Sequence, residues 1–151
     1  MPDPHQRVKI LIVEDNPTDA ELCLRSLKKH NIANDIVWLR DGAEALDYLF
    51  CKGSYEGRTA DCAPTVILLD LRLPKVEGKE VLNQLKADDK LRSIPVVVLT
   101  SSAEHRDIAQ CYQAGANSFV VKPVEFDNFA ETVAKLGYYW SLINTPPQAA
   151  N

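Results

Sequence analysis

The chain has 151 residues, of which 46% are hydrophobic, and its 17 basic and 21 acidic residues give a net charge of −4. This length supports one domain with a full hydrophobic core, and the charge balance, without a long Lys/Arg run, argues against nucleic acid as a partner. The first apolar run, residues 8–13, contains Lys9 and is too short for a signal peptide or a membrane span. Because the four cysteines show no disulfide or zinc-ligand spacing, we expect reduced thiols and a cytoplasmic protein without membrane contact.

Short apolar runs alternate with amphipathic stretches along the chain. The runs are rich in Val, Ile or Leu, which favours strands, and the stretches between them have helical period. In chain order, the sequence predicts a strand over 8–13, a helix over 17–29, a strand over 36–39, a helix over 41–50, a strand over 66–69, a helix over 77–88, a strand over 96–99, a helix over 103–114, a strand over 118–121 and a helix over 125–143.

Local signals mark several helix ends. Pro17 suits a first helical position, and Asp41 with Glu44 three residues later forms an Asp-led capping box. Gly115 follows the fourth predicted helix as a stop signal, and Pro146 cannot continue the last one. We expect residues 8–144 to form the domain between tails at 1–7 and 145–151, with 51–64 as a long surface loop.

Five alternations of strand and helix define the expected fold class. They imply parallel strands joined by right-handed crossovers, which place helices on both faces of one sheet. The sequence therefore predicts an α/β protein built as a three-layer sandwich around a five-stranded parallel sheet.

Polar side chains follow four of the five predicted strands. Glu14 and Asp15 follow the first, Asp70 the third and Lys122 the last, while Thr100 follows the fourth. In an open parallel sheet the functional crevice lies outside the carboxyl ends of the strands, so these side chains are expected to meet there.

Each of these residues alone has an ordinary explanation as a loop, cap or solvated charge, but their combination does not. Carboxylates that converge at strand ends repel one another unless they share protons or a cation, and Mg²⁺ suits an open carboxylate site. A metal beside a lysine and a hydroxyl is suited to phosphoryl chemistry, in which Asp70 can serve as nucleophile and form an acyl phosphate.

Four ordered segments, "ILIVEDNP", "VILLDLRLPKVEG", "VVVLTSS" and "FVVKPVE", resemble the signature segments of response-regulator receiver domains. The resemblance covers residues 8–143. It implies a flavodoxin-like (βα)5 sandwich in which the strands lie across the sheet in the order 2-1-3-4-5, which is known for this family. It also implies a signalling protein that is not an enzyme. Such a protein takes a phosphoryl group from a sensor histidine kinase and promotes its own phosphotransfer and dephosphorylation.

The resemblance assigns roles to the residues at the strand ends. Asp70 matches the phosphoacceptor, and Glu14 and Asp15 match an acidic pair that binds Mg²⁺, with Mn²⁺ as a substitute. Since many members have Asp where this chain has Glu14, whose longer side chain could reach the metal through water, Asp15 ranks first as a direct ligand. The remaining assignments are Asp70 and the backbone carbonyl of Arg72 as further metal ligands, Thr100 and Lys122 as phosphoryl-contacting residues, and Thr100 with Phe119 as the switch pair.

The end of the chain, "ETVAKLGYYWSLINTPP", resembles the small stand-alone regulators paired with cyanobacterial phytochrome histidine kinases. No effector domain follows, so the protein is expected to act by binding partners. One apolar face of the last helix, Phe126, Phe129, Val133, Leu136, Trp140 and Ile143, would dock on the sheet. The remaining residues, Tyr138, Tyr139 and Leu142, predict a homodimer through the fourth helix, fifth strand and fifth helix.

Three other functions compete with this interpretation. A metal-dependent phosphohydrolase of the haloacid dehalogenase type would require a second carboxylate two residues after Asp70, where this chain has Arg72. A flavodoxin would require a phosphate loop after the first strand, where Glu14 and Asp15 would repel phosphate. An adaptor without phosphorylation is disfavoured because every phosphotransfer position is filled.

Overall fold

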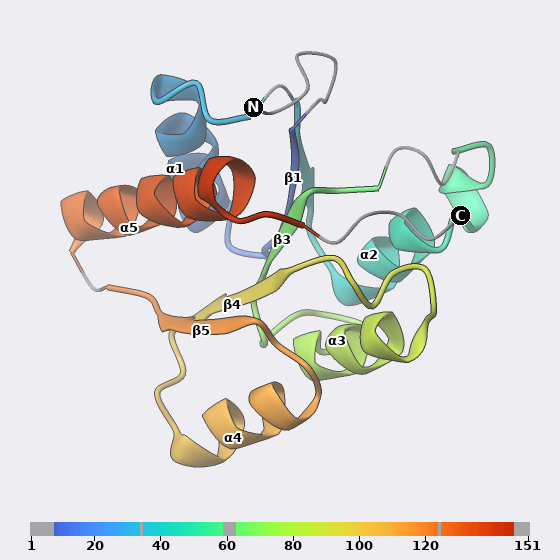
Figure 1. The fold of residues 1–151 in the computed structure, drawn as a ribbon. Coiled ribbons are helices and arrows are strands. Elements are labelled where there is room, and N and C mark those ends of the chain that lie inside the picture. The colour runs from blue at the N-terminus through green and yellow to red at the C-terminus, as the bar shows by residue number, and fades with distance from the viewer. Residues whose placement is uncertain (1–7, 34, 59–62, 124, 147–151) are drawn as a thin grey trace.

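The computed structural model describes residues 8–33, 35–58, 63–123 and 125–146, so the predicted tail 1–7 and residues 147–151 lie outside the described part. Figure 1 shows the ribbon. The elements are β1 (Lys9–Val13), α1 (Pro17–Lys29), β2 (Asp35–Leu39), α2 (Gly42–Leu49), a 3₁₀ helix η1 (Gly53–Tyr55), β3 (Val66–Leu69), α3 (Gly78–Ala87), β4 (Val96–Thr100), α4 (His105–Gln113), β5 (Ser118–Val121), α5 (Phe126–Tyr138) and a π-helical segment η3 (Tyr139–Ile143).

The sheet has the predicted topology. Its strand order is β2-β1-β3-β4-β5, and every neighbouring pair is parallel. β1 and β3 are central neighbours, and their register places Val13 beside Leu69. The residues that follow these two strands, Glu14 and Asp70, therefore leave the sheet at the same edge.

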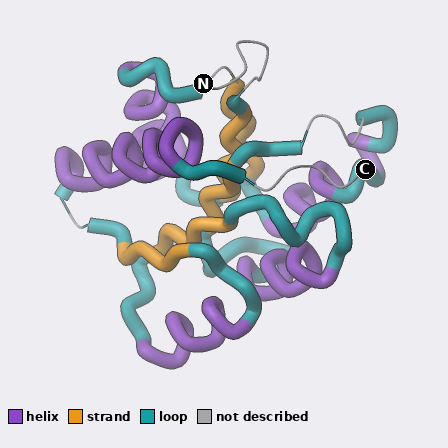
Figure 2. Tube along the Cα trace, in the orientation of Figure 1, coloured by secondary structure: helices purple, strands orange, loops and turns teal. Residues whose placement is uncertain are grey.

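Helices cover both faces of the sheet, as Figures 1 and 2 show. Side chains alternate across a strand, so Ile10 and Ile12 of β1 pack towards α1 and α5, whereas Leu11 and Val13 pack towards α2, α3 and α4. These side chains are almost completely buried. Each one stabilises the fold by about 1.5–3 kcal/mol relative to an exposed position, before the loss of chain entropy is subtracted.

The helix starts follow the local signals. Pro17 occupies the first turn of α1, and Asn16 caps that helix by accepting hydrogen bonds from the Thr18 and Asp19 amides. Asp41 caps α2 by accepting from the Glu44 amide at 2.7 Å, as predicted. The carboxylate of Glu44 instead accepts a hydrogen bond from the Tyr55 hydroxyl of η1, inside the predicted loop 51–64.

The last helix differs from its prediction at the C-terminal end. Regular α-helix stops at Tyr138, and the predicted remainder continues as the π-helical segment η3. Phe129 and Val133 are buried in the predicted docking face, but Ile143 is 54% exposed and does not belong to it. The wider π-helical turn rotates the last residues away from their α-helical positions. The side chain of Phe126 lies outside the described part.

Within the described ranges, every helix falls short of the length and apolar character that a membrane crossing requires.

Candidate functional site

Backbone hydrogen bonds continue the sheet by one residue at the ends of β1 and β3. The Glu14 amide donates to the Leu39 carbonyl at 3.0 Å, and the Asp70 amide donates to the Val13 carbonyl at 3.1 Å. The backbone of both residues is therefore fixed by the sheet itself. Both residues are also buried, with exposed fractions of 4% for Glu14 and 8% for Asp70.

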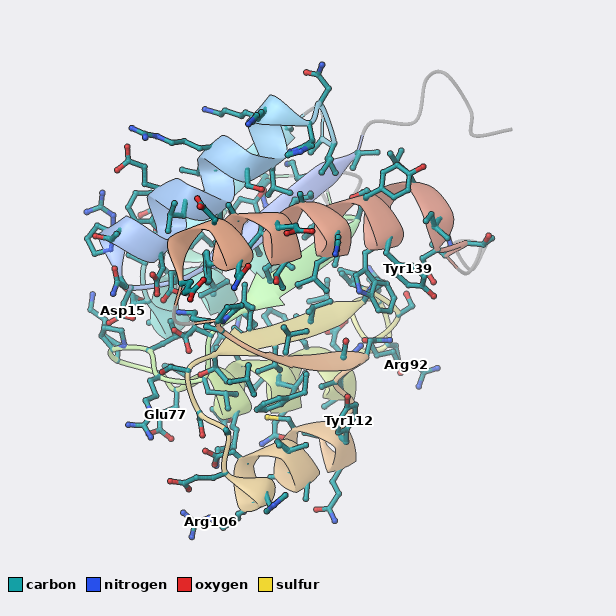
Figure 3. All side chains as sticks on the ribbon, turned by 90° about the vertical axis from the view of Figure 1, so that its left-hand side faces the viewer. Asp15, Glu77, Arg92, Arg106, Tyr112 and Tyr139 are labelled. Carbon is teal, nitrogen blue, oxygen red and sulfur yellow. The ribbon has the colours of Figure 1, made fainter. Side chains whose placement is uncertain are left out.

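Asp15 completes a group of three carboxylates at this edge. One oxygen from each of Glu14, Asp15 and Asp70 lies within 4.8 Å of the other two, and Asp15 is exposed where the other two are buried. Figure 3 shows Asp15 at the left side of the molecule, away from Tyr139. Carboxylate oxygens with one solvent-facing side match the hard-ligand, partly hydrated coordination of Mg²⁺, so this donor set fits that ion.

Lys122 places a positive charge between the carboxylates. Its ammonium group donates to Glu14, to Asp19 Oδ2 at 2.9 Å and to Asp70 Oδ2 at 3.1 Å. The Lys122 amide donates to the Thr100 carbonyl at 2.7 Å, which ties this loop to the end of β4. Four strand ends thus contribute to one cluster, as the sequence predicted.

The two buried carboxyl groups have opposite pKa shifts. Burial raises the pKa of Glu14 to about 8, aided by the hydrogen bond and the charge of Asp70. Burial would also raise the pKa of Asp70, but the hydrogen bond with Glu14 and the charge of Lys122 outweigh it and lower that pKa. The pair therefore holds a proton mainly on Glu14 and leaves Asp70 ionised, as a nucleophile must be.

Burial alone would lower the pKa of Lys122. The hydrogen bond and charge of Glu14, followed by the charge of Asp70, raise the pKa above its ordinary value instead. The ammonium group therefore stays charged and can neutralise an anion at Asp70.

Comparison with known proteins agrees with this geometry. Residues 10–134 match the model of the response regulator receiver domain family. The chain belongs to this family.

Individual relatives of this receiver domain match over most of their length. The probable methanogenesis regulatory protein FilR2 of Methanothrix harundinacea is 44% identical over 141 residues, which cover 93% of this chain and 88% of FilR2. The Mn²⁺-bound form of response regulator Rcp1, a Synechocystis protein, is 35% identical with a TM-score of 0.86 and covers 93% of this chain and 99% of its own.

A third relative is known in its phosphorylated form. The structure of phosphorylated RcpA, a cyanobacterial phytochrome response regulator, is 36% identical with a TM-score of 0.88 and covers 95% of this chain and 100% of its own. These matches confirm the fold and the family. They give no support to the haloacid dehalogenase alternative.

The expected switch residues of the receiver lie on β4 and β5. Thr100 is fully buried, and its hydroxyl accepts a long hydrogen bond of 3.5 Å from the Ser102 amide. Phe119 packs partly buried against the core on the α4 side. Its amide donates to the hydroxyl of Tyr112, on α4, at 3.2 Å. Register places Phe119 beside Val98, two residues before Thr100.

Arg72 contacts the receiver site through its backbone. Its amide donates to Asp70 Oδ1 at 3.3 Å, while its side chain is exposed. The role of its carbonyl as a metal ligand stays a prediction.

Two contacts in the receiver site were not predicted from the sequence. Asp19 reaches Lys122 from the first turn of α1, and the indole N–H of Trp38 donates to the Glu14 carbonyl at 2.8 Å. Asp19 lies in the first turn of α1, close in sequence to Glu14 and Asp15, and this proximity could have placed it near the site. Trp38 lies within an apolar strand, where no sequence signal separates it from a core residue.

Proposed function

We propose that this receiver accepts a phosphoryl group on Asp70 from the phosphohistidine of a sensor histidine kinase. The observation that carries this is the contact of 3.1 Å between the Asp70 carboxylate and the Lys122 ammonium, beside the carboxyl groups of Glu14 and Asp15. In this reaction an Asp70 oxygen attacks phosphorus, a P–O bond forms, and the P–N bond to histidine breaks with its electron pair on the imidazole. Lys122 neutralises the charge of the transferring group.

The proposal assigns the metal to the acidic group. Glu14, Asp15, Asp70 and the Arg72 carbonyl would hold Mg²⁺, for which Mn²⁺ can substitute, and the Mn²⁺-bound form of Rcp1 supports this assignment. When bound, the ion would supply positive charge that offsets the negative charge of the phosphoryl oxygens. Asp15 faces solvent and is the ligand most able to meet an ion that keeps its waters.

The receiver is proposed to lose its phosphoryl group by hydrolysis in the same site. Water attacks phosphorus, the bond to Asp70 breaks, and inorganic phosphate leaves. The protein thus promotes its own phosphotransfer and dephosphorylation while acting as a signalling protein.

Thr100 and Phe119 are the proposed switch. The Thr100 hydroxyl would move towards a phosphoryl oxygen, and Phe119 would turn into the space that it leaves. Such a movement requires that the phosphoryl group interact more favourably with one of two states of the protein. A hydrogen bond from the Thr100 side chain helps to lower the pKa of Asp70, which supports a hydroxyl that already lies beside the phosphoacceptor.

The proposed partner is a histidine kinase of the phytochrome class in the cytoplasm. The description of RcpA as a cyanobacterial phytochrome response regulator supports this pairing, although FilR2 is named for regulation of methanogenesis. Phosphotransfer measured with a purified phytochrome histidine kinase and with a purified kinase of a methanogenesis system would separate these two pairings.

A homodimer is the second proposed association. Tyr138, Tyr139 and Leu142 are each about half exposed. Tyr112 on α4 is also exposed and lies with Tyr139 at the end of the molecule away from Asp15, which supports a face of α4, β5 and α5 (Figure 3). Tyr138 and Tyr139 also line a groove of about 880 Å³ between α1 and α5, which is an alternative contact surface for the dimer.

The decisive experiment is phosphorylation of Asp70→Asn. Wild type incubated with acetyl phosphate and Mg²⁺ should gain the mass of one phosphoryl group, and Asp70→Asn should gain none, because an amide is a poor nucleophile. The matched control is Asp89→Asn, which neutralises an almost fully exposed acid and should be labelled like wild type. A stably labelled Asp70→Asn variant would contradict the assignment.

A further inference from the structure

Asp19 is the most accessible of the three acids that hold Lys122. Its side chain is 28% exposed, against 5% for Glu14 and 10% for Asp70. The Asn16 cap fixes its backbone amide at 3.2 Å, so the carboxylate is presented from the first turn of α1. This contact joins α1 to the segment that follows β5.

The hydrogen-bond capacity of Lys122 is fully used. An ammonium group has three N–H donors and no acceptor, and Glu14, Asp19 and Asp70 take one each. Lys122 can therefore contact a phosphoryl oxygen at Asp70 only if it gives up one of its three present hydrogen bonds.

Asp19 differs from the other two partners in its relation to the acidic group. Glu14 and Asp70 belong to the group of oxygens that could hold an ion, and Asp19 does not. A cation therefore competes with Lys122 for Glu14 and Asp70 but leaves the Asp19 contact in place. Water can replace this contact at small cost, because the Asp19 carboxylate already reaches solvent.

We propose that Asp19 is a positioning residue for phosphorylation: it holds the Lys122 ammonium towards α1 in the unphosphorylated receiver and gives it up to the phosphoryl group. This inference rests on the proposed function of Asp70. Asp19 thereby opposes phosphorylation, and phosphorylation releases the connection between α1 and the segment after β5.

The test compares the rate of phosphorylation by acetyl phosphate at saturating Mg²⁺ in wild type, Asp19→Asn and Asp19→Glu. Asn keeps the size of the side chain but removes its charge, so we expect a rate about three to five times that of wild type, as for a partly exposed ion pair. Asp19→Glu keeps the charge and should restore the lower rate. Glu21→Gln, which removes an equal charge from a pair with Arg25 on α1, should behave like wild type.

A second measurement does not depend on phosphotransfer. The chain has two tryptophans, so Trp140→Phe leaves Trp38, whose indole contacts the Glu14 carbonyl, as the single tryptophan. In this background, beryllofluoride, an anion shaped like a phosphoryl group, is titrated in the presence of Mg²⁺. Asp19→Asn should bind it about three to five times more tightly than the parent, and Glu21→Gln should not.

The outcomes separate the inference from the function on which it rests. A rate for Asp19→Asn equal to that of wild type would overturn the inference, since Asp19 would then be only structural. A slower rate would also overturn it, because Asp19 would be presenting Lys122 to the phosphoryl group. If wild type itself gains no phosphoryl group, the proposed function fails and the inference fails with it.

Discussion

A proton and any cation that enters the acidic group compete for the Glu14 carboxylate. Its pKa is raised to about 8 by burial and by Asp70, so the metal-free protein holds a proton there at neutral pH. A metal ligand must be deprotonated, and binding of the ion therefore releases this proton.

We accordingly expect the affinity for Mg²⁺ to rise with pH. Below the pKa of about 8, each pH unit should increase the affinity about tenfold, because one proton is displaced for each ion bound. Above this pKa the affinity should level off. Titration followed by Trp38 fluorescence between pH 6 and pH 9 measures the curve.

Glu14→Gln provides the control for this prediction. The amide cannot ionise, so the variant should bind Mg²⁺ more weakly and with little pH dependence over the same range. An equal slope in wild type and Glu14→Gln would show that another group carries the proton.

The site residues differ in how far the sequence could predict them. Asp70 and Lys122 directly follow apolar runs, and parallel topology alone brings such positions to one edge of the sheet. Asp19 lies inside a helix, where an acidic residue in the first turn is also explained by the helix dipole. Its contact with Lys122 depends on how α1 packs beside α5 at the end of the sheet, which periodicity does not encode.

Gly78 fixes the distance between α3 and the end of β3. A Cβ at this position would lie 2.2 Å from the Asp70 carbonyl oxygen and 2.7 Å from Leu71 Cα. Both contacts are with backbone, which cannot turn away as a side chain can. The close approach also allows the Gly78 amide to donate to the Leu71 carbonyl at 2.8 Å.

We expect Gly78→Ala to lower the free energy of unfolding by about 1–3 kcal/mol, the usual cost of forcing atoms into a filled site. It should also slow phosphorylation, because the shift falls on the backbone of Asp70. Urea denaturation measures the first effect. Gly57→Ala is the matched control, since a Cβ there meets nothing within 4 Å. Equal stability of the two variants would refute the packing argument.

Element boundaries were the part of the fold that the sequence predicted least well. The predicted helix 125–143 changes to η3 after Tyr138, although the spacing of its apolar residues continues to Ile143. Tyr139 packs edge-on against Trp140 with ring centroids 5.1 Å apart, a contact between successive residues that a regular helical pattern does not predict. The parallel sheet and the number of helices, by contrast, follow from alternation and chirality, whereas the strand order follows from the resemblance to receiver domains.

The homodimer can be tested on the whole molecule. Sedimentation equilibrium of wild type should show a dimer at tens of micromolar, strengthened by beryllofluoride and Mg²⁺. Tyr139→Ala should weaken it by about tenfold or more, since exposed aromatic residues dominate such contacts.

Tyr112→Ala locates the interface. If the dimer uses α4, β5 and α5, this variant should weaken association as Tyr139→Ala does. If only Tyr139→Ala has an effect, the groove between α1 and α5 is the contact surface. A wild type that stays monomeric with and without beryllofluoride rules out both.

The hydrogen bond between Tyr112 and Phe119 also bears on how copies of the protein avoid one another. β5 is a border strand of the sheet, and its outward N–H groups could recruit a strand from another molecule into a growing aggregate. The Tyr112 hydroxyl occupies the amide of Phe119 and denies an incoming strand that bond. Two molecules can then meet through side chains at this surface without fusing their sheets, which keeps association reversible.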